Sequence, residues 1–162
     1  MRARVTLIAA VSKDGFISRG KGVPWNLPED RAHFRALTAG QWLLMGRTTY
    51  EEMRGWFTPS HHPLVLTRDE ALPERVPSVQ AAIARATGEL FVCGGGQCYA
   101  AAMPHADRLV LTVVDEVLHA GVAFPAVDAA HWQRVDVREH EGFRIETWLT
   151  ANVLNAGNDG RR

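Results

Sequence analysis

Leu90-Phe91-Val92-Cys93-Gly94-Gly95-Gly96 is the stretch of the chain that decides its fold class. Four uncharged, apolar residues indicate a short buried strand, and three glycines end it. Residues 97–103 then have the composition of a helix. A strand, a glycine run and a helix in this order allow backbone N–H groups to surround a pyrophosphate. Glycines alone are a weak signal, and the flanking strand and helix give this run its weight.

Apolar runs of the same kind recur on both sides of this stretch. We predict further buried strands at residues 5–11, 41–45, 64–67 and 108–114, and a weaker one near 76–79. Helices are predicted at residues 28–37, 80–87 and 97–103. Residues 133–140 and 144–150 alternate apolar and polar side chains around Glu141-Gly142, the pattern of a β-hairpin. Alternating strands and helices followed by a hairpin predict an α/β sandwich with a mostly parallel sheet and an antiparallel edge.

Three of the predicted strands end in residues suited to phosphate binding. One runs into Gly46-Arg47, another into Thr67-Arg68, and the third into the glycine run. Gly46 permits close backbone approach, and Arg47 brings a positive charge to the start of a helix capped by Thr48 or Thr49. Ligands of such sheets bind outside the carboxyl ends of the strands, where these endings would converge. We therefore predict one phosphate-bearing ligand there, the alternative for Arg47 being an ordinary solvated arginine.

A second motif, Pro24-Trp25-Asn26-Leu27-Pro28-Glu29-Asp30, begins a helix that follows the first strand. Pro28 suits the first helical position, and the two acids then fall in the first turn. Asp30 and Phe34 are four residues apart and share one helix face, where an acid and a ring can clamp a flat, protonatable heterocycle. The alternative is a pair of solvated acids with Phe34 in the core. A dinucleotide and a flat, acid-bound substrate in one site indicate hydride transfer.

Composition bounds the class of protein. The chain has 162 residues with 18 basic and 18 acidic side chains, so nothing indicates a nucleic-acid or membrane partner. The apolar run near the N-terminus is too short to span a membrane. Cys93 and Cys98 fit no metal-binding spacing and no disulfide framework, so we expect a cytoplasmic protein without a metal. We expect a monomer with a single domain over residues 1–151 and a frayed tail at 152–162.

These motifs together resemble the dihydrofolate reductase family, over residues 5–150. The matching segments, in order, are Ile8-Ala9-Ala10, Val23-Pro24-Trp25-Asn26-Leu27-Pro28 with Asp30 and Phe34, Met45-Gly46-Arg47, Gly94-Gly95-Gly96 with Tyr99, Leu111-Thr112 and Phe124-Pro125. The resemblance implies a three-layer α/β sandwich with a mostly parallel, eight-stranded sheet and an antiparallel C-terminal hairpin. It also implies NADPH-dependent reduction of 7,8-dihydrofolate to 5,6,7,8-tetrahydrofolate by hydride transfer to the pterin imine.

The resemblance further implies which residues form the site. Asp30 would hold the amino-pyrimidine edge of the pterin and stabilise the protonated imine, with Thr112 behind it and Trp25 positioning a water that donates the proton. The implied substrate-binding residues are Ile8, Asp30, Arg31, Phe34, Met53, His61 and Thr112. The implied NADPH-binding residues are Ala10, Ile17, Gly46, Arg47, Thr48, Thr49, Thr67, Arg68, Cys93, Gly94, Gly95, Gly96, Gln97 and Tyr99. Arg47 and Arg68 would face the adenosine 2′-phosphate, and the Gly94–Gly95 peptide bond would be cis.

The chain departs from the family pattern in two places. His61 stands where the family has an arginine that binds the α-carboxylate of the substrate's glutamate, and a neutral imidazole cannot bind a carboxylate as a guanidinium does. Arg31, beside Asp30, is a candidate substitute. The segment Ala120-Gly121-Val122-Ala123 lacks the acidic residue that often holds down the loop carrying Val23. Residues 12–23 are then either a lid or an ordinary connection.

Three other functions stay open from the sequence. They are reduction of another dihydropterin such as dihydromethanopterin, a pyrimidine reductase of riboflavin synthesis, and non-catalytic binding of a pterin or nucleotide. The Ser12-Lys13-Asp14-Gly15 turn mildly favours the riboflavin-pathway enzyme, but Asp30 in its Pro-Trp-Asn-Leu-Pro setting argues against it. Intact Asp30, Trp25 and the glycine run argue against mere binding, since binding alone does not need all three.

Overall fold

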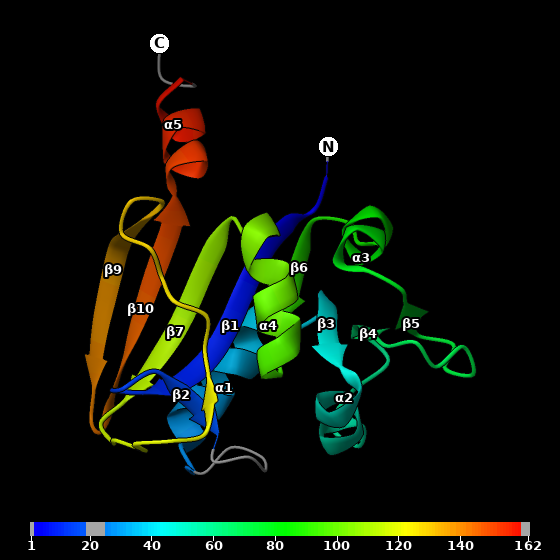
Figure 1. Cartoon of the computed structure of the whole chain (residues 1–162), viewed down its shortest axis with the longest axis horizontal. Coiled ribbons are helices and arrows are strands. Elements are labelled where there is room, and N and C mark those ends of the chain that lie inside the picture. The colour runs from blue at the N-terminus through cyan, green and yellow to red at the C-terminus, as the bar shows by residue number, and fades with distance from the viewer. Residues whose placement is uncertain (1, 19–24, 160–162) are drawn as a thin grey trace.

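The computed structural model describes residues 2–18 and 25–159, and its main element is an eight-stranded sheet (Figure 1). The strands of this sheet are β1 (Arg4–Ser12), β3 (Trp42–Gly46), β4 (His62–Leu66), β5 (Arg75–Val76), β6 (Glu89–Val92), β7 (Arg108–Val114), β9 (Trp132–His140) and β10 (Phe143–Thr150). The helices are α1 (Pro28–Thr38), α2 (Arg47–Met53), α3 (Val79–Arg85), α4 (Gly96–Ala102) and α5 (Ala151–Asp159), with a 3₁₀ helix η1 at Met103–His105. The strand order is β5-β4-β3-β6-β1-β7-β10-β9.

The sheet is parallel except at one edge. β1 lies between β6 and β7 and is parallel to both, with Leu7 opposite Val92 on one side and Leu109 on the other. β3 is parallel to both β6 and β4. β10 runs antiparallel to β7 and β9, and Gly142, at φ +83°, lies in the turn of this hairpin. The predicted mostly parallel sheet with an antiparallel C-terminal hairpin is therefore confirmed.

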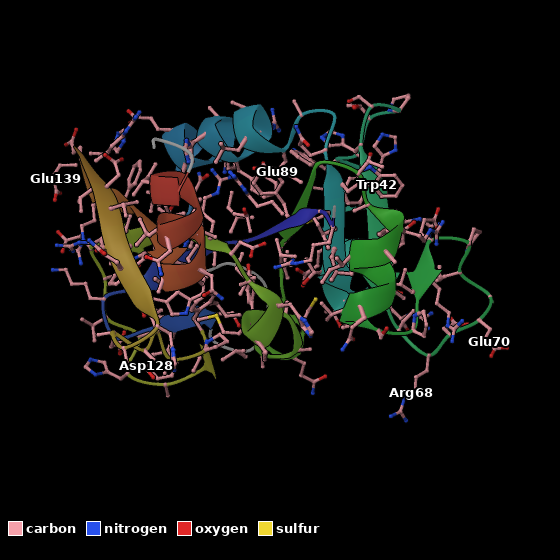
Figure 2. The ribbon with its side chains drawn as sticks, turned by 90° about the horizontal axis from the view of Figure 1, so that it is seen from above. Trp42, Arg68, Glu70, Glu89, Asp128 and Glu139 are labelled. Carbon is pink, nitrogen blue, oxygen red and sulfur yellow. The ribbon has the colours of Figure 1, made fainter. Side chains whose placement is uncertain are left out.

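Helices cover both faces of the sheet, so the fold has three layers. Val5, Leu7, Ala9 and Val11 of β1 pack in the core that α3 and α4 cover, and Ile8 packs in the opposite core with side chains of α1 and α2. Figure 2, seen from above, has α1 on one side of the sheet and α3 and α4 on the other. Burial on both faces explains why β1 reads as an almost continuous apolar run.

Short elements differ from the sequence-based prediction. β2 (Phe16–Ser18) and β8 (Val122–Ala123) form a second, two-stranded antiparallel sheet, and both are too short for an alternation pattern to reveal them. The weak strand near residues 76–79 is β5, which ends at Val76. Ser78 then caps α3, because its side chain accepts a hydrogen bond from the backbone N–H of Ala81.

The end of the chain also differs from the prediction. Residues 151–159 form α5, which continues from β10 at the edge of the molecule (Figure 1), where the polar composition predicted a frayed tail. The backbone N–H of Val153 donates to Thr150 Oγ1 at 3.4 Å, which satisfies one N–H of the first turn. Val153 and Leu154 are half-buried, so apolar packing adds to this cap. Residues 160–162 of the predicted tail and residues 19–24 of the predicted loop lie outside the described residues.

Candidate active site

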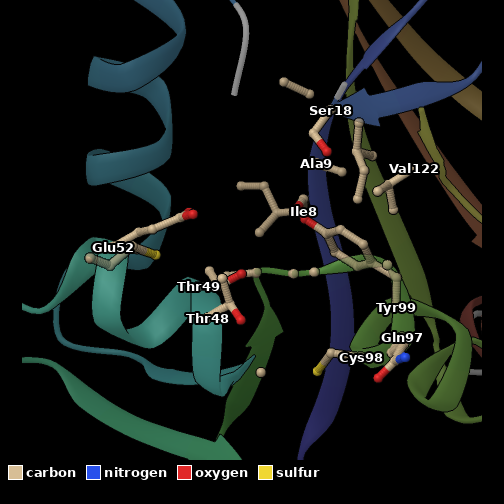
Figure 3. A pocket seen from close by; sticks show the side chains of 18 of the residues that line it. Ile8, Ala9, Ser18, Thr48, Thr49, Glu52, Gln97, Cys98, Tyr99 and Val122 are labelled. Atoms are coloured by element: carbon tan, nitrogen blue, oxygen red, sulfur yellow. Dashed lines mark hydrogen bonds between the residues drawn. The ribbon is translucent and has the colours of Figure 1, made fainter. Parts of the chain in front are cut away.

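The predicted site residues line one cavity of about 1220 Å³ at the carboxyl ends of β3, β4 and β6. Figure 3 shows Thr48, Thr49 and Glu52 of α2 on one side of it and Ile8 of β1 on the other. Every predicted site residue except His61 belongs to its lining. Ten further lining residues had not been assigned from the sequence: Ala9, Ser18, Leu27, Arg35, Glu52, Trp56, Leu66, Pro77, Cys98 and Val122. Pockets for one small molecule have volumes of about 300–1,000 Å³, so this cavity has room for two ligands side by side.

Asp30 is the carboxylate of the cavity. It lies half-buried in the first turn of α1, and Thr112 of β7 donates its hydroxyl to Asp30 Oδ1 at 2.5 Å. Burial raises the pKa of Asp30, while the Thr112 hydrogen bond and the nearby imidazoles of His33 and His140 oppose the rise. Pro28 opens α1, as predicted, and fixes Asp30 as its third residue. A desolvated carboxylate held by one hydroxyl keeps the rest of its acceptor capacity for the polar edge of a ligand.

Aromatic rings form the wall beside Asp30. Phe34 lies one turn further along α1, and its ring centroid is 5.3 Å from that of Trp56. Within the described residues, Trp25 Nε1 and His33 Nε2 are buried side-chain nitrogens without a hydrogen-bond partner. A buried indole N–H generally has an acceptor. Trp25 therefore offers a donor to a ligand in the cavity, next to a ring that can stack on it.

His61 lies outside the cavity lining, contrary to the sequence-based prediction. Its Nδ1 accepts the backbone N–H of Thr58 at 3.0 Å, and its ring packs against Trp56 with 4.8 Å between the centroids. The imidazole is thus directed toward the backbone of its own loop. Arg31 and Arg35, one turn apart on α1, line the cavity instead, and Arg35 Cζ lies 5.8 Å from the centroid of the same Trp56 ring.

The glycine run joins β6 to α4 at the edge of the cavity. The Gly94–Gly95 peptide bond is cis, as the resemblance implies. Gly94 has φ +123°, a conformation that residues with a side chain rarely adopt. Its carbonyl accepts the backbone N–H of Gly46 at 2.8 Å, and Tyr99 donates its hydroxyl to the carbonyl of Ile8 at 2.7 Å. These bonds join the glycine run after β6 to the end of β3 and, through Tyr99 of α4, to the middle of β1.

Arg47 is held by two carboxylates that the sequence did not connect with it. Its Nε lies 3.1 Å from Glu51 Oε1, and its Nη1 lies 2.6 Å from Asp69 Oδ2. The hydrogen bond to Glu51 and the charge of Asp69 raise the pKa of the guanidinium. Arg68 lines the cavity beside it and forms no ion pair with any residue that the structure describes.

Asp14 connects the turn after β1 to the loop after β7, a contact that the sequence analysis did not predict. Ser12 donates its hydroxyl to Asp14 Oδ1 at 2.6 Å, and the backbone N–H groups of Leu118 and His119 donate to the same carboxylate at 3.1 and 2.7 Å. These bonds lower the pKa of Asp14 to about 2. The turn after β1 is thereby fixed to the loop after β7. Val23 itself lies outside the described residues.

Known proteins resemble this chain over most of its length. The family profile described as Dihydrofolate reductase matches residues 4–148. Dihydrofolate reductase type 3 of Salmonella typhimurium is 37% identical over 142 residues, which are 84% of this chain and 87% of that protein. The dihydrofolate reductase of Mycobacterium tuberculosis H37Rv is 39% identical over 137 residues, which are 80% of this chain and 84% of that protein.

A solved structure shares the fold. The dihydrofolate reductase from Enterococcus faecalis, complexed with NADP(H) and RAB-propyl, matches with a TM-score of 0.80 at 24% sequence identity. The match covers 93% of this chain and 99% of that one. In the part of the chain that the structure describes, no helix is both long and apolar enough to cross a membrane.

Proposed function

Because the chain belongs to the dihydrofolate reductase family, we propose that it reduces 7,8-dihydrofolate to 5,6,7,8-tetrahydrofolate with NADPH. The observation that carries the proposal is the half-buried carboxylate of Asp30, bonded to buried Thr112 and facing a cavity with room for two ligands. A carboxylate in this position suits a substrate that becomes cationic during the reaction. The same pair speaks against a non-catalytic binding protein, because a desolvated carboxylate costs free energy that simple recognition does not require.

The cofactor half of the cavity fits NADPH. A Cβ added at Gly46 would lie 3.9 Å from the Gly94 carbonyl oxygen, and a Cβ added at Gly95 would lie 3.7 Å from Thr49 Oγ1. A side chain at either position would therefore fill the space beside the glycine run. Thr48 and Thr49 offer hydroxyls on the same side, and Arg68 offers a positive charge. When bound, NADPH would supply the hydride that is added to the carbon of the pterin imine.

The residues around the substrate would carry out the rest of the reaction. Asp30 would accept hydrogen bonds from the amino-pyrimidine edge, and its negative charge would stabilise the positive charge on the protonated imine nitrogen. Thr112 would keep the carboxylate oriented through its hydrogen bond. Trp25 would use its unpartnered indole N–H to position the water that gives the nitrogen its proton. Phe34 would stack on the pterin, and the ring wall would exclude other water.

The glutamate tail of the substrate needs a positive charge that His61 does not supply. We propose that Arg31 and Arg35 bind its carboxylate, because both line the cavity and lie one turn apart on α1. Their guanidinium groups would form charge-assisted, bidentate bonds with the carboxylate, the role that the family's arginine would have from the position of His61. The orientation of His61 also keeps a second candidate open: a reductase of another dihydropterin whose tail carries no glutamate.

Steady-state kinetics with two substrates separates these candidates. Arg31→Ala and Arg35→Ala are assayed with dihydrofolate and with a dihydropterin that lacks the tail, and exposed Arg54→Ala, which does not line the cavity, is the control. Loss of a charge-assisted contact of about 1.5–3 kcal/mol would raise KM for dihydrofolate roughly ten- to a hundredfold. KM for the tail-less substrate should stay unchanged. If neither variant distinguishes the substrates, the tail is not bound here, and another dihydropterin becomes the better substrate.

We also propose that the enzyme is a cytoplasmic monomer. Cys93 and Cys98 are free thiols, which suits a reducing compartment. Size-exclusion chromatography with light scattering would measure the mass directly, and a stable dimer of about twice 17.9 kDa would contradict the second half of the proposal.

A further inference from the structure

Asp69 forms an ion pair with Arg47, the arginine proposed to bind the adenosine 2′-phosphate of NADPH. Its Oδ2 lies 2.6 Å from Arg47 Nη1, and Glu51 binds the Nε of the same guanidinium at 3.1 Å. One positive charge therefore faces two negative charges at the end of β3. A phosphate dianion that approaches Arg47 must either displace these carboxylates or lie close to them, and both alternatives weaken its binding.

Asp69 is the better fixed of the two carboxylates. The backbone N–H of Ala71 donates to Asp69 Oδ1 at 3.0 Å, and the backbone N–H of Asp69 itself donates to Thr67 Oγ1 at 3.2 Å. The Asp69 side chain is 32% exposed, whereas that of Glu51 is 59% exposed. Glu51 can therefore swing into solvent at little cost, but Asp69 is held in place by the turn that carries it.

Arg68, unlike Arg47, has no carboxylate bound to its guanidinium among the described residues. It is the neighbour of Asp69 and lines the same cavity, yet it forms no ion pair among residues 2–18 and 25–159. Figure 2 shows its side chain extending from the protein into solvent. A guanidinium without a carboxylate partner can turn onto a phosphate without first breaking an ion pair.

We propose that Asp69 is a specificity-determining residue that competes with the cofactor 2′-phosphate for Arg47 and leaves Arg68 as its principal anchor. The proposal rests on the proposed use of NADPH. It makes the preference for NADPH over NADH smaller than two adjacent arginines would give. The carboxylate that repels a 2′-phosphate is also a suitable acceptor for a free ribose 2′-hydroxyl, as an acidic residue is in NAD-binding folds.

The test is a binding experiment that does not depend on turnover. Affinities of 2′,5′-ADP and 5′-AMP are measured by calorimetry for the wild-type protein and for Asp69→Asn. Asparagine keeps an Oδ1 that accepts the Ala71 N–H, so the turn is preserved while the charge is removed. Glu70→Gln is the matched control, since it removes one negative charge from the next residue, which is exposed and points away from the protein (Figure 2).

We expect Asp69→Asn to tighten 2′,5′-ADP binding by about two- to fivefold, the upper part of the range for interactions between exposed charges, and to leave 5′-AMP binding unchanged or weaker. Glu70→Gln should change neither by more than about twofold, because screening by salt weakens charges that are further away. Weaker binding of 2′,5′-ADP by Asp69→Asn would show that Asp69 positions Arg47 for the phosphate and would overturn the proposal. If Glu70→Gln tightened 2′,5′-ADP binding as much as Asp69→Asn does, the proposal would also be overturned, because the change in net charge alone would explain both results.

The result separates this proposal from the proposed function. If the wild-type protein binds NADPH and 2′,5′-ADP but Asp69→Asn does not favour the phosphate, the reductase assignment stands and the role of Asp69 falls. If the wild-type protein binds neither, the cofactor assignment is wrong, and the role of Asp69 falls with it.

Discussion

Replacing Asp30 by asparagine should slow hydride transfer and, at neutral pH, stabilise the fold, because both effects follow from the negative charge of a partly buried carboxylate. The amide side chain of the Asp30→Asn variant keeps the shape and an Oδ1 that accepts the Thr112 hydroxyl, which donates at 2.5 Å in the wild-type protein. The substitution removes the negative charge that would stabilise the protonated imine. From the usual range for general acid–base contributions, we expect hydride transfer at pH 7 to slow by roughly 10²-fold. That factor corresponds to about 2.7 kcal/mol of lost transition-state stabilisation.

The same substitution should raise the thermal stability at neutral pH. Burial raises the pKa of Asp30 above its ordinary value, so the folded state favours the protonated carboxyl. This contribution to stability is fully present below the unfolded-state pKa and is lost as the pH rises through the folded-state pKa. At pH 7 the ionised Asp30 therefore destabilises the fold, and a neutral asparagine does not. We expect the Tm of Asp30→Asn to exceed that of the wild-type protein at pH 7 and the difference to shrink as the pH falls through the folded-state pKa.

Two measurements on one protein preparation test the predicted effects on the hydride-transfer rate and on Tm. Single-turnover rates of NADPH oxidation with dihydrofolate give the chemical step between pH 5 and 9, and calorimetry gives Tm over the same range. Glu29→Gln is the control, because it removes an exposed acid from the same helical turn without touching the cavity. The rate deficit of Asp30→Asn should shrink at low pH, where solvent protonates the substrate. A pH-independent deficit, or a Tm at pH 7 below that of the wild-type protein, would refute the reasoning.

Three further substitutions test neighbouring parts of the site. Thr112→Val removes the hydroxyl that lowers the pKa of Asp30, so the pH–rate profile should shift to higher pH, whereas Thr112→Ser should not move it. Arg47→Ala should weaken NADPH more than NADH, and equal losses for the two cofactors would contradict its place near the 2′-phosphate. Gly96→Ala would bring a Cβ to 2.5 Å from Val122 Cγ1. We expect this overpacking to lower the free energy of unfolding by about 1–3 kcal/mol and the Tm by several degrees. A second substitution in the same chain, Val122→Ala, should restore most of the lost stability.

The fold was predictable because its strongest signals are local. Residues 5–11 and 90–93 are apolar on both faces, which is what a central parallel strand requires. The alternation around Gly142 likewise matched β9 and β10. α5 was missed because composition alone does not show that Thr150 caps its first turn or that Val153 packs. β2 and β8 were missed because pairing across more than a hundred residues leaves no periodic trace in strands of two or three residues.

The site was predictable wherever its residues follow a strand end or share a helix face. Asp30 and Phe34 lie on one wall of the cavity because they are one turn apart. The pairing of Arg47 with Asp69 was not predictable, since it joins residues 22 positions apart across the ends of two strands. His61 was predicted to bind substrate but does not line the cavity, because its Nδ1 accepts the Thr58 N–H within its own loop, a local contact that the sequence does not show. Asp14 was visible in the sequence, but its partners are backbone N–H groups, which carry no sequence signal.

Isotope transfer tests most directly whether this cavity carries out hydride transfer to a dihydropterin. The protein is incubated with dihydrofolate and with NADPH deuterated on both hydrogens of the nicotinamide C4, and the product is analysed by mass spectrometry and NMR. We predict one deuterium in tetrahydrofolate, on the carbon of the former imine, and one equivalent of NADP⁺ for each product molecule. With Asp30→Asn, the initial rate of this transfer should be roughly a hundredfold lower. Oxidation of NADPH without deuterium in the pterin, or binding of both ligands with no reaction at all, would contradict the assignment.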